Sequence, residues 1–427
     1  MFMSWSSNTV RNMMMLATAT IFLLSMSAFL WDSTVSVTVY KYNPSLKIDH
    51  NGEQFLSYLP HSGLSNQRTE LENALLLASY LNRTLILPPA FLGHIRGWQP
   101  KDNLFNYLES LTKPQPWWNR CSDKLGLADG PCHTKDTYAT VPWEFLHSSI
   151  NDIGVPVRSI RQISLAKTKA MLTLTDDEVY VHHDNTMYSW RLCDKPKEQC
   201  PELNAGTGHV YEQQWTIEDL QAIDKPLLHL QGIFGTGRVS VSRPEHLALR
   251  TKIRQSLIYR NLAMGQVTDN IAKQLGGKQR YFSIHVRMGD HQFLGGLQKH
   301  LDEQIAFLEK SLVDAGNPTT SSCETEEYKI YVATDAKDPR ISPELAPIFS
   351  RFPCAKVLGD YIDLLSPLDA EVDTFQPPQK TIIRFLIPII DAMVAGNAKN
   401  FMGTPGSTFS AYIRRLHSAY APSKYQP

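Results

Sequence analysis

Two polar residues, His285 and Arg287, lie at the end of an apolar segment near the middle of the chain. Residues 281–286 are mostly aromatic or branched, which is typical of a strand covered on both faces. Because His285 and Arg287 are two residues apart, their side chains leave the strand on the same face. Ligands of α/β sheets gather at the carboxyl ends of the strands, where a guanidinium offers a planar fork of donors to phosphate or carboxylate. The pattern predicts an anion site; the alternatives are a surface ion pair for Arg287 and a packing role for His285.

Strands and helices alternate around this segment. In the second half we expect strands at 281–286, 328–333, 356–358 and 400–402, and helices at 245–275, 301–314, near Pro343, at 381–395 and at 407–415. Near the N-terminus, a strand at 54–59, a helix at 67–78 and a strand at 84–87 stopped by two prolines form a βαβ unit. The alternation predicts an α/β fold with two doubly wound domains.

The stretch between these regions, about 93–208, is rich in Trp, Pro and Cys and has little periodicity. We expect insertions and short elements there, around weak strands such as 178–182, and a further strand at 227–230. Gly232, Gly235 and Gly237 follow that strand. Their spacing fits neither familiar phosphate motif, which favours a flexible crossing between domains over a phosphate loop.

The chain has 427 residues, with 42 basic and 42 acidic side chains. This balance leaves no global field that would draw the protein to nucleic acid or an anionic membrane. Residues 13–31 carry no charge and are long enough to cross a bilayer as a helix, between Arg11 and Asp32. The run predicts a single-pass type II anchor with a luminal body in the endoplasmic reticulum or Golgi membrane. A signal peptide cleaved near 25–27 is the alternative.

The cysteines also indicate the secretory pathway. All six lie beyond the apolar run, and an even number in an oxidising compartment suggests disulfides. Pairing sequence neighbours is the simplest of the fifteen possible connectivities, and it gives Cys121–Cys132, Cys193–Cys200 and Cys323–Cys354. The sequence has no CxxC motif, and Asn82 begins its one glycosylation sequon.

Three separated segments make the chain resemble the GDP-fucose protein O-fucosyltransferase family. The first is Gly63-Leu64-Ser65-Asn66-Gln67-Arg68 with the following helix and residues 81–89, and the second is residues 284–290. The third comprises residues 391–395, 400–403 and 406–410, with residues 331–335 as a supporting match. Their order and spacing over roughly 350 residues carry the resemblance, to which the region from about 95 to 225 contributes little.

The resemblance implies a GT-B fold, in which two Rossmann-like domains face each other across a cleft. We expect a cytosolic tail at 1–12, the anchor at 13–31, a stem at 32–52, an acceptor-side domain at 53–235 and a GDP-sugar-binding domain at 236–427. The family transfers fucose from GDP-fucose with inversion, without a metal ion or other cofactor, to a Ser or Thr hydroxyl of a protein. The absence of an Asp-x-Asp pair agrees with a metal-free site.

Five residues of this chain match positions that form the anion site in the family. By resemblance, Arg287 binds the diphosphate and the leaving oxygen, and His285 lines the same pocket. Ser407, Thr408 and Phe409 open a helix, whose free N–H groups and dipole form an anion site. An ordinary helix cap is the alternative for Ser407 and Thr408.

Other positions would recognise the rest of the donor. Asp391 matches an acidic position that reads the guanine edge, with a polar residue on a surface helix as the alternative. Asp335 is expected to contact the base or ribose, or else to have a structural role. Gly63 would let the backbone approach the donor, and Asn66 would bond near the reacting sugar or diphosphate, or simply cap the helix.

The general base stays open in the sequence. Glu70, or else Glu72, could deprotonate an acceptor hydroxyl if aimed inward, although glutamates on a helix face are usually solvated. The chain departs from the common Gly-Gly or Gly-Arg opening with Ser62-Gly63-Leu64, which leaves the acceptor open. The alternatives are a transferase that uses GDP-fucose or another nucleotide sugar on a glycan acceptor, a silent lectin-like relative, and a membrane-tethered scaffold. The pair His182-His183 is not expected to bind metal, because adjacent side chains diverge on a strand.

Overall fold

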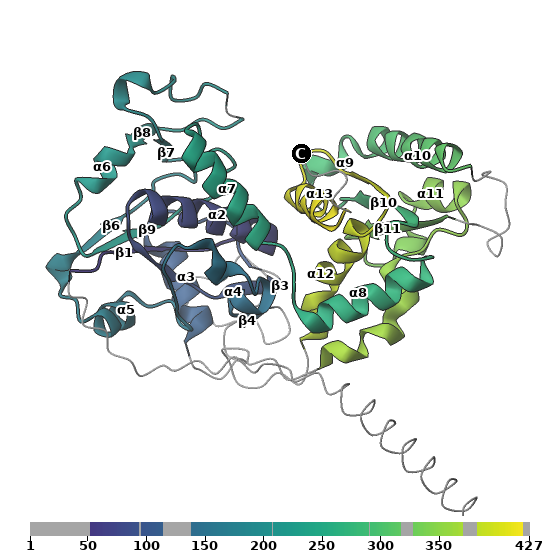
Figure 1. Cartoon of the computed structure of the whole chain (residues 1–427), viewed down its shortest axis with the longest axis horizontal. Helices are drawn as coiled ribbons and strands as arrows, with labels where there is room; N and C mark the ends of the chain where they lie inside the picture. Colours follow the sequence, from purple (N-terminus) through teal and green to yellow (C-terminus); the bar gives the residue numbers. More distant parts are fainter. Residues whose placement is uncertain are drawn as a thin grey trace, which may run out of the picture. The chain divides into compact units, whose positions relative to one another are not determined.

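The structure is a computed structural model that describes residues 52–93, 95–113, 138–206, 208–289, 291–316, 328–369 and 382–421 (Figure 1). The predicted tail, the predicted anchor and the predicted stem up to residue 51 lie outside the described residues, as do Cys121, Cys132 and Cys323. In the described ranges, no helix combines the length and the apolar character needed to cross a membrane.

A parallel sheet of five strands forms the first half of the described chain. Its order is β5 (Val157–Ser159), β2 (Thr84–Leu87), β1 (Phe55–Tyr58), β9 (Leu227–Leu230) and β6 (Val179–His182). The strands predicted at 54–59, 84–87, 178–182 and 227–230 are confirmed, and β5 was not predicted. Helix α2 (Leu64–Tyr80) packs on this sheet and begins three residues before the predicted 67, with Gly63 as its N-cap residue.

Short elements form the described residues between 93 and 226, and for the part up to about 208 the weak periodicity predicted them. The helices are α3 (Asp102–Thr112), α4 (Trp143–Leu146), η3 (Ile150–Ile153), α5 (Leu165–Leu172), η4 (Asp176–Glu178), η5 (Lys197–Gln199) and α6 (Ile217–Gln221). Two small sheets join β3 (Ala90–Gly93) to β4 (Tyr138–Val141) and β7 (Trp190–Cys193) to β8 (Gln213–Thr216). The predicted disulfide Cys193–Cys200 is confirmed, and Cys354 is also disulfide-bonded.

The single helix predicted at 245–275 is wrong. Two helices occupy this stretch, α7 (Pro244–Ser256) and α8 (Leu262–Gln274), and the Asn261 side chain caps α8 by accepting from the Met264 amide. Helix α7 contacts α2, whereas α8 contacts α12 (Ile383–Gly396) and η7 (Leu358–Asp369). The predicted domain boundary at 235 stays a prediction.

A three-stranded parallel sheet forms the second half, in the order β11 (Lys329–Thr334), β10 (Tyr281–Val286), β12 (Asn400–Gly403). The predicted strand at 356–358 is reduced to one bridge between Lys356 and Tyr331. The other helices are α9 (His291–Leu294), α10 (Leu297–Asp314), η6 (Pro339–Ile341), α11 (Ala346–Arg351) and α13 (Thr408–Tyr420). The two sheets with their helices give the α/β fold that the sequence predicted (Figure 1).

The alternation of β10 divides its side chains between two helical layers. Phe282, Ile284 and Val286 pack in a cluster with residues of α10 and α11. On the other face, the Tyr281 and Ser283 hydroxyls donate to carbonyls of α12. His285 belongs to this second face because side chains alternate along a strand.

Helix α2 joins the two halves through charged and aromatic contacts. Glu72 pairs with Arg254 of α7 at 2.7 Å and with Arg415 of α13 at 3.1 Å. The buried Arg68 guanidinium lies over the Tyr412 ring of α13, and its Nη1 donates to the Tyr259 hydroxyl. These contacts hold the start of α2 against the start of α13.

Candidate functional site

Arg287 follows the last residue of β10, at the carboxyl end of the second sheet. Its Nη1 lies 2.7 Å from Asp335 Oδ2, just after the end of the neighbouring β11, and its side chain is 31% exposed. The Asp335 carboxylate also accepts from the backbone amides of Met288 and Gly289. In this structure Asp335 therefore fixes both the arginine and the loop that carries it. Its predicted contact with base or ribose stays a prediction.

His285 lies on β10, two residues before Arg287, and is buried. Its Nδ1 lies 2.6 Å from the Ser410 hydroxyl, and its ring centroid is 4.9 Å from that of Phe409. Burial, the largest effect, lowers the pKa of His285 to about 4, so the ring is neutral near pH 7. A neutral imidazole can orient hydroxyls and pack against a ligand without competing with Arg287 for an anion.

The N-terminus of α13 lies beside this histidine. Ser407 is the N-cap residue, and its hydroxyl accepts from the Ser410 amide, as an ordinary cap would. Thr404 connects the cap to β10, because its hydroxyl donates to the His285 carbonyl and accepts from the Arg287 amide. Neither Thr404 nor Ser410 was predicted as a site residue from the sequence.

The predicted residues of the first and third segments meet directly. The Thr408 hydroxyl donates to Asn66 Oδ1 at 3.0 Å, although 342 positions separate them in the sequence. Gly63, at the start of the same helix as Asn66, is exposed, and an added Cβ would meet nothing within 4 Å. The space beside Gly63 is therefore open, and the approach of its backbone to the donor stays a prediction.

Gly403 provides a test of how closely β12 approaches α13. A Cβ at this position would lie 2.6 Å from the Ser410 Cβ and 2.8 Å from its Oγ. We expect Gly403→Ala to lower the free energy of unfolding by about 1–3 kcal/mol, measured by urea titration, because a packed interface must open. Gly265→Ala in α8 is the matched control, since its Cβ would meet nothing within 4 Å and alanine favours a helix. Equal stability of the two variants would contradict this packing.

Asp391 lies in the wall of a cavity of about 210 Å³ near the carboxyl end of β11. Apolar residues line much of this cavity, among them Val332, Val357, Leu365 and Ile387. The Tyr331 hydroxyl donates to Asp391 Oδ1 at 2.5 Å, and burial, the largest effect, raises the pKa of Asp391 to about 7. Asp391 is thus buried beside a cavity, not on the surface of a helix.

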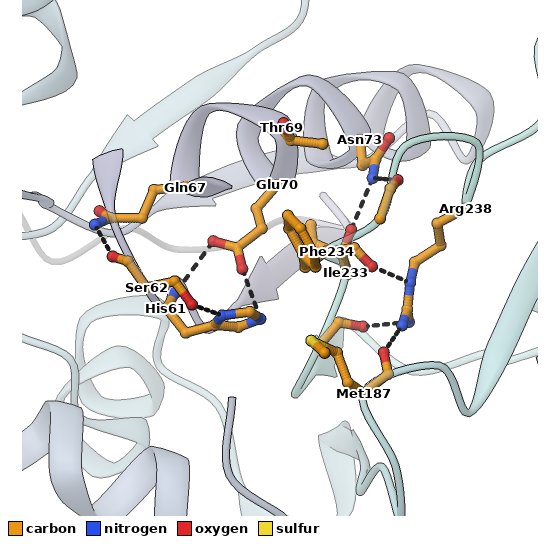
Figure 2. A network of polar contacts seen from close by, with 12 residues as sticks. His61, Ser62, Gln67, Thr69, Glu70, Asn73, Met187, Ile233, Phe234 and Arg238 are labelled. Carbon is orange, nitrogen blue, oxygen red and sulfur yellow. Dashed lines mark hydrogen bonds and ion pairs between the residues drawn. The ribbon is translucent and has the colours of Figure 1, made fainter. Parts of the chain in front are cut away.

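The two glutamates considered as general bases are both buried. Glu72 is occupied by Arg254 and Arg415. Glu70 lies 2.9 Å from His61 Nε2 and also accepts from the His61 backbone amide, as Figure 2 shows. His61 in turn contacts the Ser62 hydroxyl. His61 and Ser62 were missed from the sequence, although they directly precede the recognised Gly63.

The glycines after β9 belong to an ordered turn. The fully buried Arg238 guanidinium donates to the carbonyls of Gly232, Phe234 and Met187, and the Asn73 amide donates to the carbonyls of Ile233 and Gly235 (Figure 2). The expectation of a flexible crossing is wrong here. The buried Arg238 orders these carbonyls, and the spacing of the glycines does not predict this arginine's role.

In the part of the chain that the structure describes, no three His, Cys, Asp or Glu residues are placed to hold a metal ion together. His182 faces Asp184 at 3.4 Å, whereas His183 faces Asp102 at 3.2 Å. The adjacent histidines diverge, as expected for neighbours on a strand.

Most of the predicted site residues form one connected set. Arg287, His285 and Asp335 lie at the ends of β10 and β11, and Thr404 and Ser410 connect them to the start of α13. Thr408 extends the connection to Asn66 of α2. A cation, several hydroxyl donors and a helix N-terminus thus meet at one edge of the second sheet, where they can bind a phosphorylated ligand.

Comparison with known proteins gives one short sequence match. No family model matches the chain. A segment of 43 residues is 60% identical to "O-fucosyltransferase 30" of Arabidopsis thaliana, which is 10% of this chain and 8% of that protein. The match confirms the resemblance to O-fucosyltransferases within that segment, and the chain matches less than a tenth of that relative's length.

Solved structures of two fucosyltransferases align with most of this chain, with TM-scores below 0.5. POFUT1 in complex with GDP and in complex with GDP-fucose each give a TM-score of 0.44 and 13% identity, covering 87% of this chain and 97% and 96% of theirs. The fucosyltransferase NodZ from Bradyrhizobium gives 0.39 and 13%, covering 85% of this chain and 93% of its own. At these scores the likeness carries no argument about fold or function.

Proposed function

We propose that this chain is an O-fucosyltransferase, a GT-B glycosyltransferase that transfers fucose from GDP-fucose with inversion and without a metal ion. The proposal rests on the resemblance of the sequence and on the short match to an O-fucosyltransferase. The observation that carries it furthest is the hydrogen bond between Thr408 and Asn66. This bond brings together two of the three segments that gave the resemblance. Thr404 connects the remaining segment to α13, because it accepts from the Arg287 amide and its own amide donates to the Ser410 hydroxyl.

Arg287 takes the main role in the proposed reaction. An acceptor oxygen attacks C1 of fucose from the side opposite the diphosphate, and the electron pair of the broken C1–O bond leaves with GDP. The growing charge on the diphosphate needs fixed donors when no metal is present. Arg287, the Ser407 hydroxyl and the free amides of α13 are the donors at this edge of the sheet. The Thr408 hydroxyl joins them when its proton turns from Asn66 Oδ1 to the diphosphate. His285 and Phe409 form the wall behind them.

Asp391 is the proposed guanine reader. A carboxylate can accept from the two neighbouring donors on the guanine edge, and the cavity beside Asp391 has apolar walls for a base. Asp335 holds Arg287 in position before the donor binds, and contact with the base or ribose is its second proposed role. Asn66 and Gly63 complete the donor site from the side of α2.

We assign the acceptor as a Ser or Thr hydroxyl of a protein, within the secretory pathway. The acceptor assignment rests on the family resemblance. The luminal location, in the endoplasmic reticulum or Golgi, rests on the apolar run at 13–31 and on the disulfide Cys193–Cys200. A glycan acceptor is the alternative that an acceptor screen would reveal.

A donor screen tests the proposal. The purified protein is incubated with a panel of nucleotide sugars in EDTA, and both binding and nucleotide release are measured. We expect binding and consumption of GDP-fucose alone, with no loss of rate in EDTA. Consumption of a different donor would contradict the fucose assignment, and loss of activity in EDTA would contradict the metal-free mechanism. Binding without consumption in the presence of protein and glycan acceptors would indicate a lectin-like role.

A further inference from the structure

Ser62, His61 and Glu70 form a series of close polar contacts at the turn between β1 and α2. The Ser62 hydroxyl lies 2.8 Å from His61 Nδ1, and His61 Nε2 lies 2.9 Å from Glu70 Oε1. The second Glu70 oxygen accepts from the His61 backbone amide at 3.1 Å. Figure 2 shows the three side chains in this order, from the turn inward to the helix.

The carboxylate selects the tautomer of the histidine. Glu70 Oε1 faces Nε2, so the favoured imidazole carries its proton on Nε2 and presents the lone pair of Nδ1 to the Ser62 hydroxyl. The two atoms are 2.9 Å apart without the geometry of a good hydrogen bond, so the carboxylate favours the proton on Nε2 through its charge. A carboxylate, an imidazole and a hydroxyl in this series are the parts that activate a hydroxyl in many hydrolases and transferases.

The series connects a buried acid to a partly exposed hydroxyl. Glu70 is 0% exposed and His61 is 1% exposed, so neither can reach an acceptor molecule directly, whereas Ser62 is half-buried. Ser62 has a left-handed backbone with a φ of 63°, which is uncommon for a residue other than glycine and is found preferentially at functional sites. Its amide donates to the Arg96 carbonyl and its carbonyl accepts from the Gln67 amide group. The turn is therefore fixed with the hydroxyl directed at His61.

The position of Ser62 places this series at the proposed donor site. Ser62 lies at the carboxyl end of β1, where ligands of parallel sheets bind. It precedes Gly63, beside which the space is open, and Asn66 on the first turn of α2 contacts Thr408 of the donor site.

We propose that Ser62 and His61 form the proton relay that activates the acceptor, and that Glu70 is a positioning residue that does not touch it. The inference rests on the proposed function. As the acceptor oxygen bonds to C1 of fucose, its proton passes to Ser62 Oγ while the Ser62 proton passes to His61 Nδ1. The C1–O bond to the diphosphate breaks, and GDP leaves with the electron pair. The imidazolium faces the Glu70 carboxylate until its proton returns to solvent through Ser62.

The test uses water and azide as acceptors, so that no natural acceptor is needed. His61→Gln keeps a donor toward Glu70 but has no basic nitrogen, and we expect GDP release from GDP-fucose in water to fall about 10²–10⁴-fold. Azide carries no proton, so its attack on C1 needs no base. Added azide should restore GDP release in His61→Gln and yield fucosyl azide, detected by mass spectrometry. A variant with only a disturbed turn would gain nothing from azide.

Glu70→Gln tests the positioning role. The amide would donate to His61 Nε2 and leave the proton on Nδ1, the wrong tautomer for accepting from Ser62. We expect the same loss in water and the same rescue by azide. Thr69→Ala is the matched control, because Thr69 is adjacent on α2 and, within the described ranges, its hydroxyl donates to the Ser65 carbonyl of its own helix.

Binding of GDP-fucose, measured by calorimetry on every variant, separates the two proposals. Unchanged binding with lost hydrolysis and azide rescue supports the relay. Full hydrolysis by His61→Gln, or failure of azide to rescue a variant that binds GDP-fucose, overturns the relay and leaves the transferase intact. A wild-type protein that does not bind GDP-fucose overturns both.

Discussion

Arg287→Ala is expected to slow GDP release from GDP-fucose by about 10²–10³-fold, with a smaller effect on GDP-fucose binding. Removing one preorganised donor from a developing anion has this magnitude in enzymes, and the loss falls mainly on the rate because the charge grows in the transition state. Steady-state kinetics of GDP release, with binding measured separately, check both parts of the expectation.

Two further arginine variants make the experiment specific. Arg287→Lys keeps the charge but not the planar fork, and should recover only part of the rate. Arg351→Ala is the matched control, because Arg351 forms an ion pair with Glu309 at 2.5 Å on the surface of the same half of the chain. Undiminished turnover in Arg287→Ala would show that the arginine has no diphosphate to hold.

Affinity for GDP-fucose is expected to rise about tenfold between pH 6 and pH 8, because of Asp391. Burial raises the pKa of Asp391 to about 7 in the free protein. Only the ionised carboxylate can accept from both guanine donors, so binding favours the deprotonated form. The affinity should therefore fall as the pH drops through 7, and level off above 8. Calorimetry with GDP-fucose measures this, and GDP is avoided because its terminal phosphate titrates in the same range.

Asp391→Asn removes both the charge and the titration. We expect this variant to bind GDP-fucose about 10–100-fold more weakly at pH 8, as for loss of hydrogen bonds to a charged group, and to show a flat profile over the same pH range. Asp391 would be excluded from the guanine site if the affinity of the wild-type protein for GDP-fucose did not change with pH. The same would follow if the variant kept the wild-type dependence on pH.

Strands were easier to predict than the helices and loops around them. The apolar runs that form β1, β2, β9 and β10 are bounded by polar or proline residues, and burial on both faces of a parallel sheet preserves that signal. The break between α7 and α8 was missed because residues 257–259 are as apolar as a helix face and only the Asn261 cap marks the new start. The strand expected at 356–358 has the right residue types but forms only one bridge.

The candidate site was predicted in its parts but not in its contacts. Arg287 and His285 could be placed on one strand face from spacing alone, and Asn66, Asp391 and Ser407 came from the family resemblance. The contact of Asn66 with Thr408 depends on the packing of α2 against α13, which no local pattern encodes. Glu70 was expected on a solvated helix face because its charge normally requires water, and a partner nine residues earlier could not be inferred from helical periodicity. The left-handed turn at Ser62 makes that partnership possible.

In the proposed enzyme, the ion pair between Arg287 and Asp335 would also affect how GDP leaves after the reaction. GDP carries more negative charge than GDP-fucose, so a site that stabilises the leaving group also retains it. Asp335 lies 2.7 Å from the guanidinium and can take the place of the diphosphate as soon as it begins to withdraw. In the proposed reaction, Arg287 would exchange the diphosphate for the Asp335 carboxylate during each turnover, so that its charge always has an anionic partner. In the proposed enzyme this exchange lowers the barrier to product release that tight binding of the leaving group would otherwise impose.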